Sequence, residues 1–270
     1  MSMTFFSKKR ASRAKQRYEG GTANFAKPYL LDKDSAFGVT EAFRSLKAAL
    51  SVSVPKKESD GSINIMVTSN FPGEGKTTVT VNTALMFAQS NFKVLIVDAD
   101  IRRGRVAKFF KAHHKPGLSD YISGQNKIEE ILYPSNVHPN LYFIPRGTTS
   151  AHSYEWLESE AMQELMQKLS TEFDYILLDT PPVKLVADAL ALVPVTSGAL
   201  IVCKHMHTYE SDLRSTLESL AFAKANVLGV VVNDYHVNVR KLKGGYKKYY
   251  SSYAYGYGFS SKEETEQEEK

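Results

Sequence analysis

The sequence predicts an α/β fold, in which a doubly wound and mainly parallel sheet carries helices on both faces. Three observations support this fold class. Short apolar runs, typical of strands buried in a parallel sheet, alternate along the chain with segments of helical periodicity. A glycine-rich loop joins the first of these strands to a helix. Two later strands each end in aspartate, at the end where such sheets bind ligands.

The first half of the predicted fold contains two helices and two strands. Apolar residues recur at helical spacing over residues 39–50, with charged residues on the opposite side. A polar break over residues 55–61 separates this helix from an apolar strand over residues 63–69. A helix over residues 76–90 follows the glycine-rich loop, and a continuous apolar run predicts the next strand over residues 93–98.

The second half continues the alternation of strands and helices. Residues 116–140 are expected to form a loop with one short helix near Ile128, and residues 141–144 a strand. The remaining elements are helices over 156–169, 184–193 and 210–225, and strands over 174–179, 198–203 and 227–232. Because strands alternate with helices, we expect right-handed crossovers between parallel strands.

One large domain accounts for most of the 270 residues. We place it at residues 36–243, between a basic, flexible N-terminal segment (residues 1–35) and a flexible C-terminal tail (residues 244–270). The N-terminal segment is expected to be irregular and poorly packed. Its cations between residues 8 and 17, without one acid, suit a solvated tail best. Proximity to an anionic membrane surface comes second, and nucleic acid is the remaining alternative.

Composition narrows the class of protein. A hydrophobic content of 43% is ordinary for a globular chain with a good core. The single cysteine, Cys203, lies in an apolar run, so we interpret it as a small buried hydrophobe. No disulfide framework can form, which fits a reducing cytoplasm. No apolar stretch predicts a signal peptide or a membrane span.

The most informative segment is the loop between the first predicted strand and its helix. Its residues are Pro72, Gly73, Glu74, Gly75, Lys76, Thr77 and Thr78. Strand, glycine-rich loop, Gly-Lys-Thr and helix is the layout of a cradle for the phosphates of a nucleoside triphosphate. The glycines let backbone N–H groups face a phosphate, Lys76 supplies positive charge, and the Thr77 hydroxyl is placed to bind Mg²⁺.

Three acids favour the nucleotide site over a second interpretation of this loop. Asn70 stands where the strict loop pattern has glycine, so Gly-Lys-Thr could merely cap a helix. Asp98 and Asp100 follow one buried strand, however, and Asp179 ends another. Because the carboxyl ends of parallel strands meet at one edge of a sheet, we expect these acids to converge on the loop. Asp179 stands where an aspartate would hold Mg²⁺, through a water molecule.

Tyrosines gather near the C-terminus. The cluster is Tyr246, Tyr249, Tyr250, Tyr253, Tyr255 and Tyr257, mixed with glycine, serine and lysine. Five glutamates follow, at positions 263, 264, 266, 268 and 269. Such a segment suits a flexible tail, which could be an interaction segment or a supply of acceptor hydroxyls for phosphoryl transfer. A flexible tether would give the tyrosines a high effective concentration at a nearby active site.

Taken in order, these motifs resemble one family. The loop, the segments 95–102 and 176–182, and the tyrosine cluster are similar to the bacterial protein-tyrosine kinases of the capsule and exopolysaccharide type, called BY-kinases. The resemblance extends over residues 36–257, and the three nucleotide motifs correspond to the family's Walker A, Walker A′ and Walker B. It implies a P-loop fold and an autokinase that uses ATP and Mg²⁺ to phosphorylate its tyrosine cluster in trans.

The resemblance also implies roles for the nucleotide-site residues. Lys76 would stabilise the transferring phosphoryl group, and Thr77 would bind Mg²⁺ with support from Asp100 and Asp179. Asp98 would be the base or the positioning group for the acceptor hydroxyl. A carboxylate within hydrogen-bond reach of a tyrosine can orient its hydroxyl and take its proton as the bond to phosphorus forms.

Further expectations concern assembly and partners. The family's helix motif E-x-x-R-x-x-R would fall on Glu41, Arg44 and Lys47, and it resembles the surface by which subunits form a ring, such as an octamer. Lys47 replaces the last arginine and cannot make the same bidentate fork. Asn233 matches a position that often contacts adenine in related proteins, with a plain turn residue as the alternative.

The resemblance further implies a membrane-spanning activator whose cytoplasmic end completes the nucleotide site, and a tyrosine phosphatase that reverses the reaction. The protein would then act at the inner face of the plasma membrane in polysaccharide synthesis or export, without nucleic acid. Cell-division and partitioning ATPases share the fold and the Asp98-x-Asp100 pair, but usually carry a signature lysine where this chain has Phe71. A switch ATPase with the tail as an interaction segment is therefore the alternative, and a non-catalytic scaffold is a third.

Overall fold

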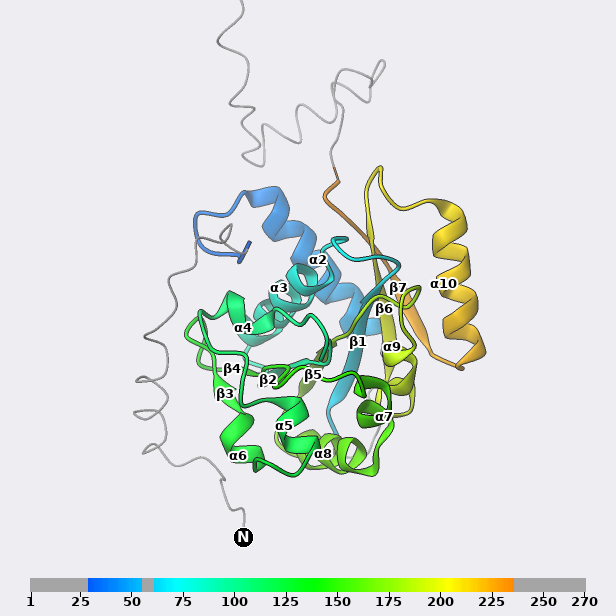
Figure 1. The fold of residues 1–270 in the computed structure, drawn as a ribbon. Helices are drawn as coiled ribbons and strands as arrows, with labels where there is room; N and C mark the ends of the chain where they lie inside the picture. The colour runs from blue at the N-terminus through cyan, green and yellow to red at the C-terminus, as the bar shows by residue number, and fades with distance from the viewer. Residues whose placement is uncertain (1–28, 55–60, 236–270) are drawn as a thin grey trace, which may run out of the picture.

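Seven strands form one sheet in the part of the chain that the structure describes, which is residues 29–54 and 61–235 of this computed structural model (Figure 1). The strands are β1 (Ile63–Ser69), β2 (Val94–Asp98), β3 (Tyr133–Pro134), β4 (Leu141–Ile144), β5 (Tyr175–Asp179), β6 (Gly198–Lys204) and β7 (Val227–Asn233). The helices are α2 (Phe37–Ser53), α3 (Lys76–Gln89), α4 (Val106–Phe109), α5 (Leu118–Ile122), α6 (Ile128–Ile131), α7 (Ser153–Glu158), α8 (Glu160–Ser170), α9 (Asp188–Ala191) and α10 (Glu210–Phe222), with a short 3₁₀ helix, η2 (Val193–Val195).

The sheet is parallel except at one edge, which confirms the predicted fold class. The strand order is β3-β4-β2-β5-β1-β6-β7, and β3 pairs antiparallel with β4. β2, β5 and β1 are consecutive neighbours, and Asp98 of β2 lies opposite Asp179 of β5, which lies opposite Val67 of β1. The loops that leave the carboxyl ends of these three strands therefore lie side by side, where parallel sheets bind ligands.

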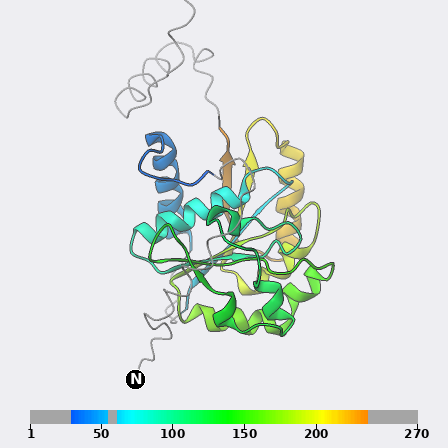
Figure 2. The same ribbon diagram turned by 60° about the vertical axis from the view of Figure 1, so that its left-hand side comes forward.

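Alternate residues along each strand pack against different helices, because successive side chains point to opposite faces of a sheet. On one face, Ile65 and Val67 pack in a buried cluster with α3, which contributes Phe87. On the other face, Met66 packs in a cluster with α8, which contributes Leu165. Figure 2 shows the blue and cyan helices α2 and α3 on one side of the sheet and green helices on the other. Helices on both faces were predicted, and this is confirmed.

Three predicted segments differ from the structure. Residues 116–140, which were expected to contain one short helix, contain two, α5 and α6, and the short strand β3. The helix expected over residues 156–169 is two helices, α7 and α8, because Ser159 has extended backbone angles and its hydroxyl accepts a hydrogen bond from the N–H of Met162. The helix expected over residues 184–193 is wrong in extent, since α9 covers only Asp188–Ala191. The chain before α9 is held to β1 by a 3.0 Å bond from Val183 N to Ser69 O. Helical hydrogen bonding therefore begins later than the apolar periodicity indicated.

The segment before α2 also departs from expectation. Residues 29–35 form no regular element, as predicted, and most of them are exposed, but one residue packs against α3. Leu31 is buried, and its N–H donates a 2.7 Å hydrogen bond to Asn82 Oδ1 on α3. No helix within residues 29–54 and 61–235 is both long and apolar enough to cross a membrane.

Candidate nucleotide and phosphoryl-transfer site

The loop after β1 has the backbone geometry of an anion cradle. Gly73 and Gly75 have φ values of 83° and 93°, a left-handed conformation that glycine adopts without steric cost. Gly75 precedes the first residue of α3, Lys76, so the N–H groups of the first helical turn point toward the loop. The start of a helix combines unsatisfied N–H groups with a partial positive charge. The loop can therefore bind phosphate oxygens through its backbone.

A buried carboxylate holds this loop in shape. Glu74 is fully buried, and its side chain accepts hydrogen bonds from the N–H groups of Asn70 and Phe71 at 2.7 and 2.9 Å. The hydroxyl of Thr208, in the connection between β6 and α10, donates to the same carboxylate. Glu74 therefore satisfies the donors at the start of the loop and joins the loop to a segment more than a hundred residues away.

Asn233 contacts the same loop from the end of β7. Its side-chain N–H group donates a 3.0 Å hydrogen bond to the backbone oxygen of Glu74. A Cβ atom on Gly75 would lie only 1.9 Å from Asn233 Nδ2, so this packing requires glycine at position 75. The structure thus places Asn233 at the phosphate loop.

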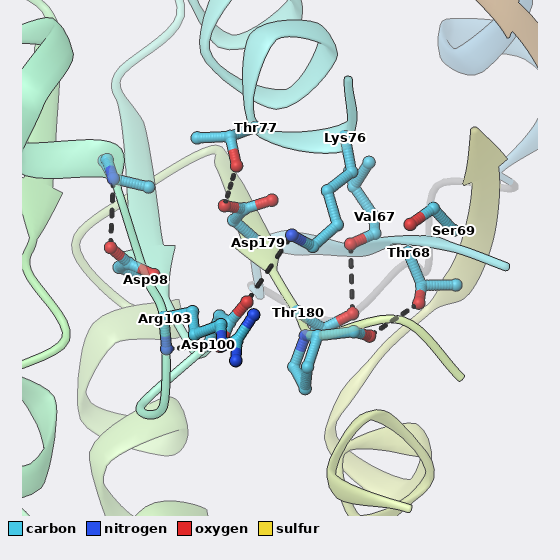
Figure 3. Close-up of polar contacts among 12 residues, drawn as sticks. Val67, Thr68, Ser69, Lys76, Thr77, Asp98, Asp100, Arg103, Asp179 and Thr180 are labelled. Atoms are coloured by element: carbon cyan, nitrogen blue, oxygen red, sulfur yellow. Dashed lines mark hydrogen bonds and ion pairs between the residues drawn. The ribbon is translucent and has the colours of Figure 1, made fainter. Parts of the chain in front are cut away.

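Lys76 and Thr77 each meet one of the predicted acids (Figure 3). Lys76 Nζ lies 3.5 Å from Asp100 Oδ2, and Thr77 Oγ1 donates a 2.7 Å hydrogen bond to Asp179 Oδ2. The N–H of Arg103 donates to the other oxygen of Asp100 at 2.8 Å. The loop and the ends of β2 and β5 therefore meet as the sequence predicted.

Asp98 faces a different neighbour. Its Oδ2 accepts a 3.0 Å hydrogen bond from the N–H of Val106 at the start of α4, and its Oδ1 is buried without a hydrogen-bond partner among the described residues. A Cβ atom on Gly104 would lie 2.2 Å from Asp98 Oδ1, so the turn between β2 and α4 closes directly over this carboxylate. Asp98 thus has one oxygen fixed by the backbone of α4 and one that is buried beneath Gly104 with no hydrogen-bond partner among the described residues.

The electrostatics of the site favour a bound cation. Burial raises the pKa of Asp98 well above its usual value, and the charge of nearby Asp179 raises it further. Burial also raises the pKa of Asp179 to about 6, although Lys76 and the Thr77 hydroxyl favour its charged form. Three buried acids beside one lysine leave an excess of negative charge, which a divalent cation would neutralise.

Oxygen ligands for Mg²⁺ are present at Thr77 and Asp179. No group of three or more His, Cys, Asp or Glu side chains suited to a metal occurs in the described part of the chain. Mg²⁺ is usually bound by one or two carboxylates together with substrate phosphates and water. The pair of Thr77 and Asp179 fits an ion that arrives with a nucleotide, and Asp100 contacts Lys76 nearby.

The residues predicted for assembly and as phosphoryl acceptors belong to other parts of the chain. Glu41 and Arg44 form an ion pair with each other on α2, one turn before Lys47. The six tyrosines from Tyr246 to Tyr257 lie outside the described residues. Sequence reasoning missed Thr80, Gly104 and Thr208, of which Thr80 donates to Asp179 at 3.4 Å. Of these three residues, only Gly104 stands out in the sequence itself, because it interrupts a run of arginines.

Comparison with known proteins places these features in context. Residues 63–221 match the family described as AAA domain. Tyrosine-protein kinase CpsD of Streptococcus pneumoniae is 33% identical over 190 residues, which cover 70% of this chain and 82% of that protein. The chain spans only 29–30% of the length of the longer curated relatives that it matches.

Solved structures share the fold. The BceF tyrosine kinase domain is 30% identical, with a TM-score of 0.65 and coverage of 72% of this chain and 76% of that one. The cell division ATPase MinD of Pyrococcus furiosus is 25% identical, with a TM-score of 0.56 and coverage of 71% and 80%.

Proposed function

This chain belongs to the family of bacterial tyrosine-protein kinases, and we propose that it transfers the γ-phosphoryl group of ATP to tyrosine hydroxyls. The acceptor oxygen bonds to the γ-phosphorus while the bond from that phosphorus to ADP breaks, and the tyrosine loses its proton. The observation that carries the proposal is the position of Asp98, which lies opposite Asp179 in the pairing of β2 with β5 but takes no part in the contacts of Lys76 and Thr77.

The loop and Lys76 supply the charge compensation that this reaction needs. Phosphoryl transfer depends on cations and N–H donors placed over the spreading negative charge. We assign Lys76 and the N–H groups at the start of α3 to the phosphates. Mg²⁺ bound with ATP would add charge neutralisation, held by Thr77 and Asp179 with Asp100 in support. Asn233 would sit at the nucleotide because it already contacts Glu74 of the loop.

We assign Asp98 to the acceptor tyrosine. Its Oδ2 is fixed by Val106, so Oδ1 is the oxygen that can accept a hydrogen bond from a hydroxyl. A tyrosine has a pKa of about 10 and is almost entirely protonated at neutral pH. A raised pKa for Asp98 makes this carboxylate a better proton acceptor as the bond to phosphorus forms.

The acceptors that we propose are the tail tyrosines of a neighbouring copy. The cluster from Tyr246 to Tyr257 begins eleven residues after Tyr235, the last described residue, so a tether links it to the domain. Each phosphate adds about −1.5 to −2 charges, so several phosphates in one cluster would repel one another. Phosphorylation would then weaken assembly, and a tyrosine phosphatase would restore it.

Assembly and location follow the same proposal. A homo-oligomeric ring, such as an octamer, would use Glu41, Arg44 and Lys47 of α2. A membrane-spanning activator would hold the protein at the inner face of the plasma membrane, where it would regulate capsule or exopolysaccharide synthesis or export. The name of CpsD and the match to it support this direction.

Intact-mass measurement tests the proposed reaction. The wild-type chain, incubated with ATP and Mg²⁺ and with the cytoplasmic end of its membrane partner, is expected to gain several phosphates. Lys76→Met is expected to gain none, because the transferred group loses its cation. A matched variant, Lys127→Met, changes an exposed lysine before α6 and should behave as the wild type.

The alternative is a switch ATPase whose tail only binds partners, which the shared fold with MinD favours. Release of inorganic phosphate without any gain in protein mass would support it and would contradict the kinase proposal. A scaffold that uses nucleotide only to set its assembly state predicts neither product.

A further inference from the structure

A continuous stretch of cations leaves the active site at the end of β2. Residues 101–115 contain Arg102, Arg103, Arg105, Lys108, Lys111 and Lys115, with His113 and His114, and no acid. All eight of these side chains are exposed. We call this surface the basic rim.

The basic rim begins directly beside Asp98. The N–H of Val106, which follows Arg105, donates to Asp98 Oδ2, and the N–H of Arg103 donates to Asp100. Gly104, between these two arginines, covers the Asp98 carboxylate. An anionic ligand on the rim would therefore be anchored within a few residues of the proposed acceptor position.

The far part of the rim folds back toward the same edge. The N–H of Gly147 bonds to the backbone oxygen of His114 at 2.8 Å, and Arg146 Nη1 donates to the backbone oxygen of Ile101 at 3.2 Å. Burial lowers the pKa of His114, and the charges of Arg146, Lys115 and His113 lower it further, which places these cations together. Positive charge thus extends from the end of β2 to the connection after β4.

Few carboxylates oppose this charge. Arg102 pairs with Asp188 at 3.1 Å, and Asp120, near His114, accepts from the N–H of Gly117 at 2.8 Å. Within residues 29–54 and 61–235, no ion pair joins Arg103, Arg105, Lys111 or Lys115 to an acid. Arg103, Arg105, Lys111 and Lys115 therefore offer positive charge to an anionic partner.

We propose that the basic rim binds the acidic C-terminal segment of a second copy, residues 263–269, and so delivers the tyrosines of that copy to Asp98. The proposal rests on the proposed kinase function. The segment carries five glutamates in seven residues, and it is the most acidic stretch of the chain. Its charge complements the six cations of the rim, and both lie on the chain itself.

Chain length makes this arrangement feasible. Five residues separate Tyr257 from Glu263, and the six Cα-to-Cα steps between the two span about 20 Å when the chain is extended. α4 has four residues, so Arg105 and Lys111 flank a helix of only about 6 Å. A glutamate on the rim therefore leaves enough chain for a tyrosine of the cluster to reach Asp98. Binding of the glutamates to the rim would raise the local concentration of tyrosine near Asp98, and the rim need not contact the tyrosine ring.

A charge-swap experiment tests the docking. The enzyme copy is the full chain with its six tail tyrosines changed to phenylalanine, and the acceptor copy is the full chain carrying Lys76→Met. The acceptor tail is either native or reversed by Glu263→Lys, Glu266→Lys and Glu269→Lys. The enzyme rim is either native or reversed by Arg105→Glu, Lys111→Glu and Lys115→Glu. Transfer to each acceptor is measured by intact mass at several acceptor concentrations.

With the native enzyme, the reversed tail is expected to raise KM for the acceptor about tenfold with kcat unchanged, because each exposed ion pair contributes modestly and several act together. The reversed rim is expected to prefer the reversed tail. Both enzymes should phosphorylate a peptide of residues 246–257 equally. A control enzyme with Lys127→Glu, Lys168→Glu and Lys224→Glu, which are exposed and outside the rim, should prefer the native tail to the same extent as the native enzyme.

Equal KM values for native and reversed tails would overturn the docking while leaving the kinase proposal intact. Loss of transfer to the short peptide in the reversed-rim enzyme would also overturn it, since the rim would then act in catalysis. The reversed-rim enzyme could instead lose binding to anionic vesicles or to nucleic acid while its KM for the acceptor stays unchanged. That result would overturn the docking and assign the rim to the other partner. Absence of transfer to every acceptor by the native enzyme would instead contradict the kinase proposal itself.

Discussion

Thr77 Oγ1 donates a 2.7 Å hydrogen bond to Asp179 Oδ2, so the first turn of α3 is joined to the carboxyl end of β5. Thr80, one turn further along α3, reaches the other oxygen of the same carboxylate at 3.4 Å. Asp179 is fully buried and lies opposite Asp98 in the pairing of β5 with β2. Two hydroxyls thus fix the orientation of the carboxylate that we assign to Mg²⁺.

Replacing Asp179 by Asn is expected to stabilise the nucleotide-free protein at neutral pH. Burial raises the pKa of Asp179 from 3.8 to about 6, so the folded state holds its proton more tightly than the unfolded state does. The resulting stability is complete below the unfolded pKa and is lost as the pH rises through about 6. This shift corresponds to about 3 kcal/mol, some of which the weaker hydrogen bonds of the amide would offset.

Urea unfolding without nucleotide measures the effect. The higher stability of Asp179→Asn is expected at about pH 7.5 and should be nearly lost at about pH 3, where both states of the wild type are largely protonated at this residue. With ATP and Mg²⁺ the order should reverse, because the variant loses a ligand. An advantage of the same size at both pH values would contradict the assigned cause.

Asp98 is expected to set the acid limit of activity. Burial and the charge of Asp179 raise the pKa of Asp98. Asp98 should therefore take up a proton, and stop acting as a base, at a pH higher than the usual carboxylate pKa of about 4. The rate of transfer, kcat/KM, should therefore fall as the pH is lowered through this raised value. Asp98→Asn should lower the rate of transfer by about 10²- to 10⁴-fold at all pH values, and the fall of kcat/KM at low pH should disappear. Nucleotide binding, measured by calorimetry, should persist, and a wild-type rate in the variant would exclude the role.

Glu74 is expected to matter for the phosphate loop without touching the transferred group. In Glu74→Gln, an amide with one acceptor oxygen replaces a carboxylate whose two oxygens both accept from Asn70 Nδ2, so a donor of Asn70 then faces the amide nitrogen. An unsatisfied buried group costs about 1–3 kcal/mol, so the free energy of unfolding should fall by that amount.

ATP affinity should also fall in Glu74→Gln, because the loop loses the contact that shapes it. Thr208→Val is the matched control, since it removes the hydroxyl that donates to Glu74 and accepts from Lys204 N, and leaves the backbone contacts of Glu74 in place. Its cost should be about 1 kcal/mol. Calorimetric ATP affinity and urea unfolding together check both variants. Unchanged affinity in Glu74→Gln would contradict a role in shaping the loop.

Gly104→Ala is expected to damage the acceptor side of the site. A Cβ atom there would lie 2.2 Å from Asp98 Oδ1, so either the carboxylate or the turn must move. Transfer to tyrosine should fall at least tenfold because a small misplacement of a reacting group is costly. Gly124→Ala is the control, since nothing lies within 4 Å of the added atom although φ is +75°. It should lose stability through backbone strain and retain its activity.

The site was predictable to the extent that its signals are local. The strand, the glycine-rich loop and Gly-Lys-Thr are consecutive, so their chemistry can be read without knowing the tertiary structure. The meeting of Asp98, Asp100 and Asp179 followed from one rule about parallel strands, and the geometry confirms it. The rule did not predict which neighbour each aspartate contacts. The turn after β2 alone turns Asp100 toward Lys76 and places Asp98 under Gly104.

The sequence by itself determined the fold class, six of the seven strands and the chemistry of the loop, because apolar periodicity and short motifs act over few residues. The tertiary structure decided the contacts between distant segments, such as Thr208 with Glu74 and Asn233 with the loop backbone. It also decided that the helix expected over residues 156–169 divides at Ser159, and that the chain before α9 follows β1. Hydrogen bonds across long sequence separations override local helical preference, and no local pattern encodes them.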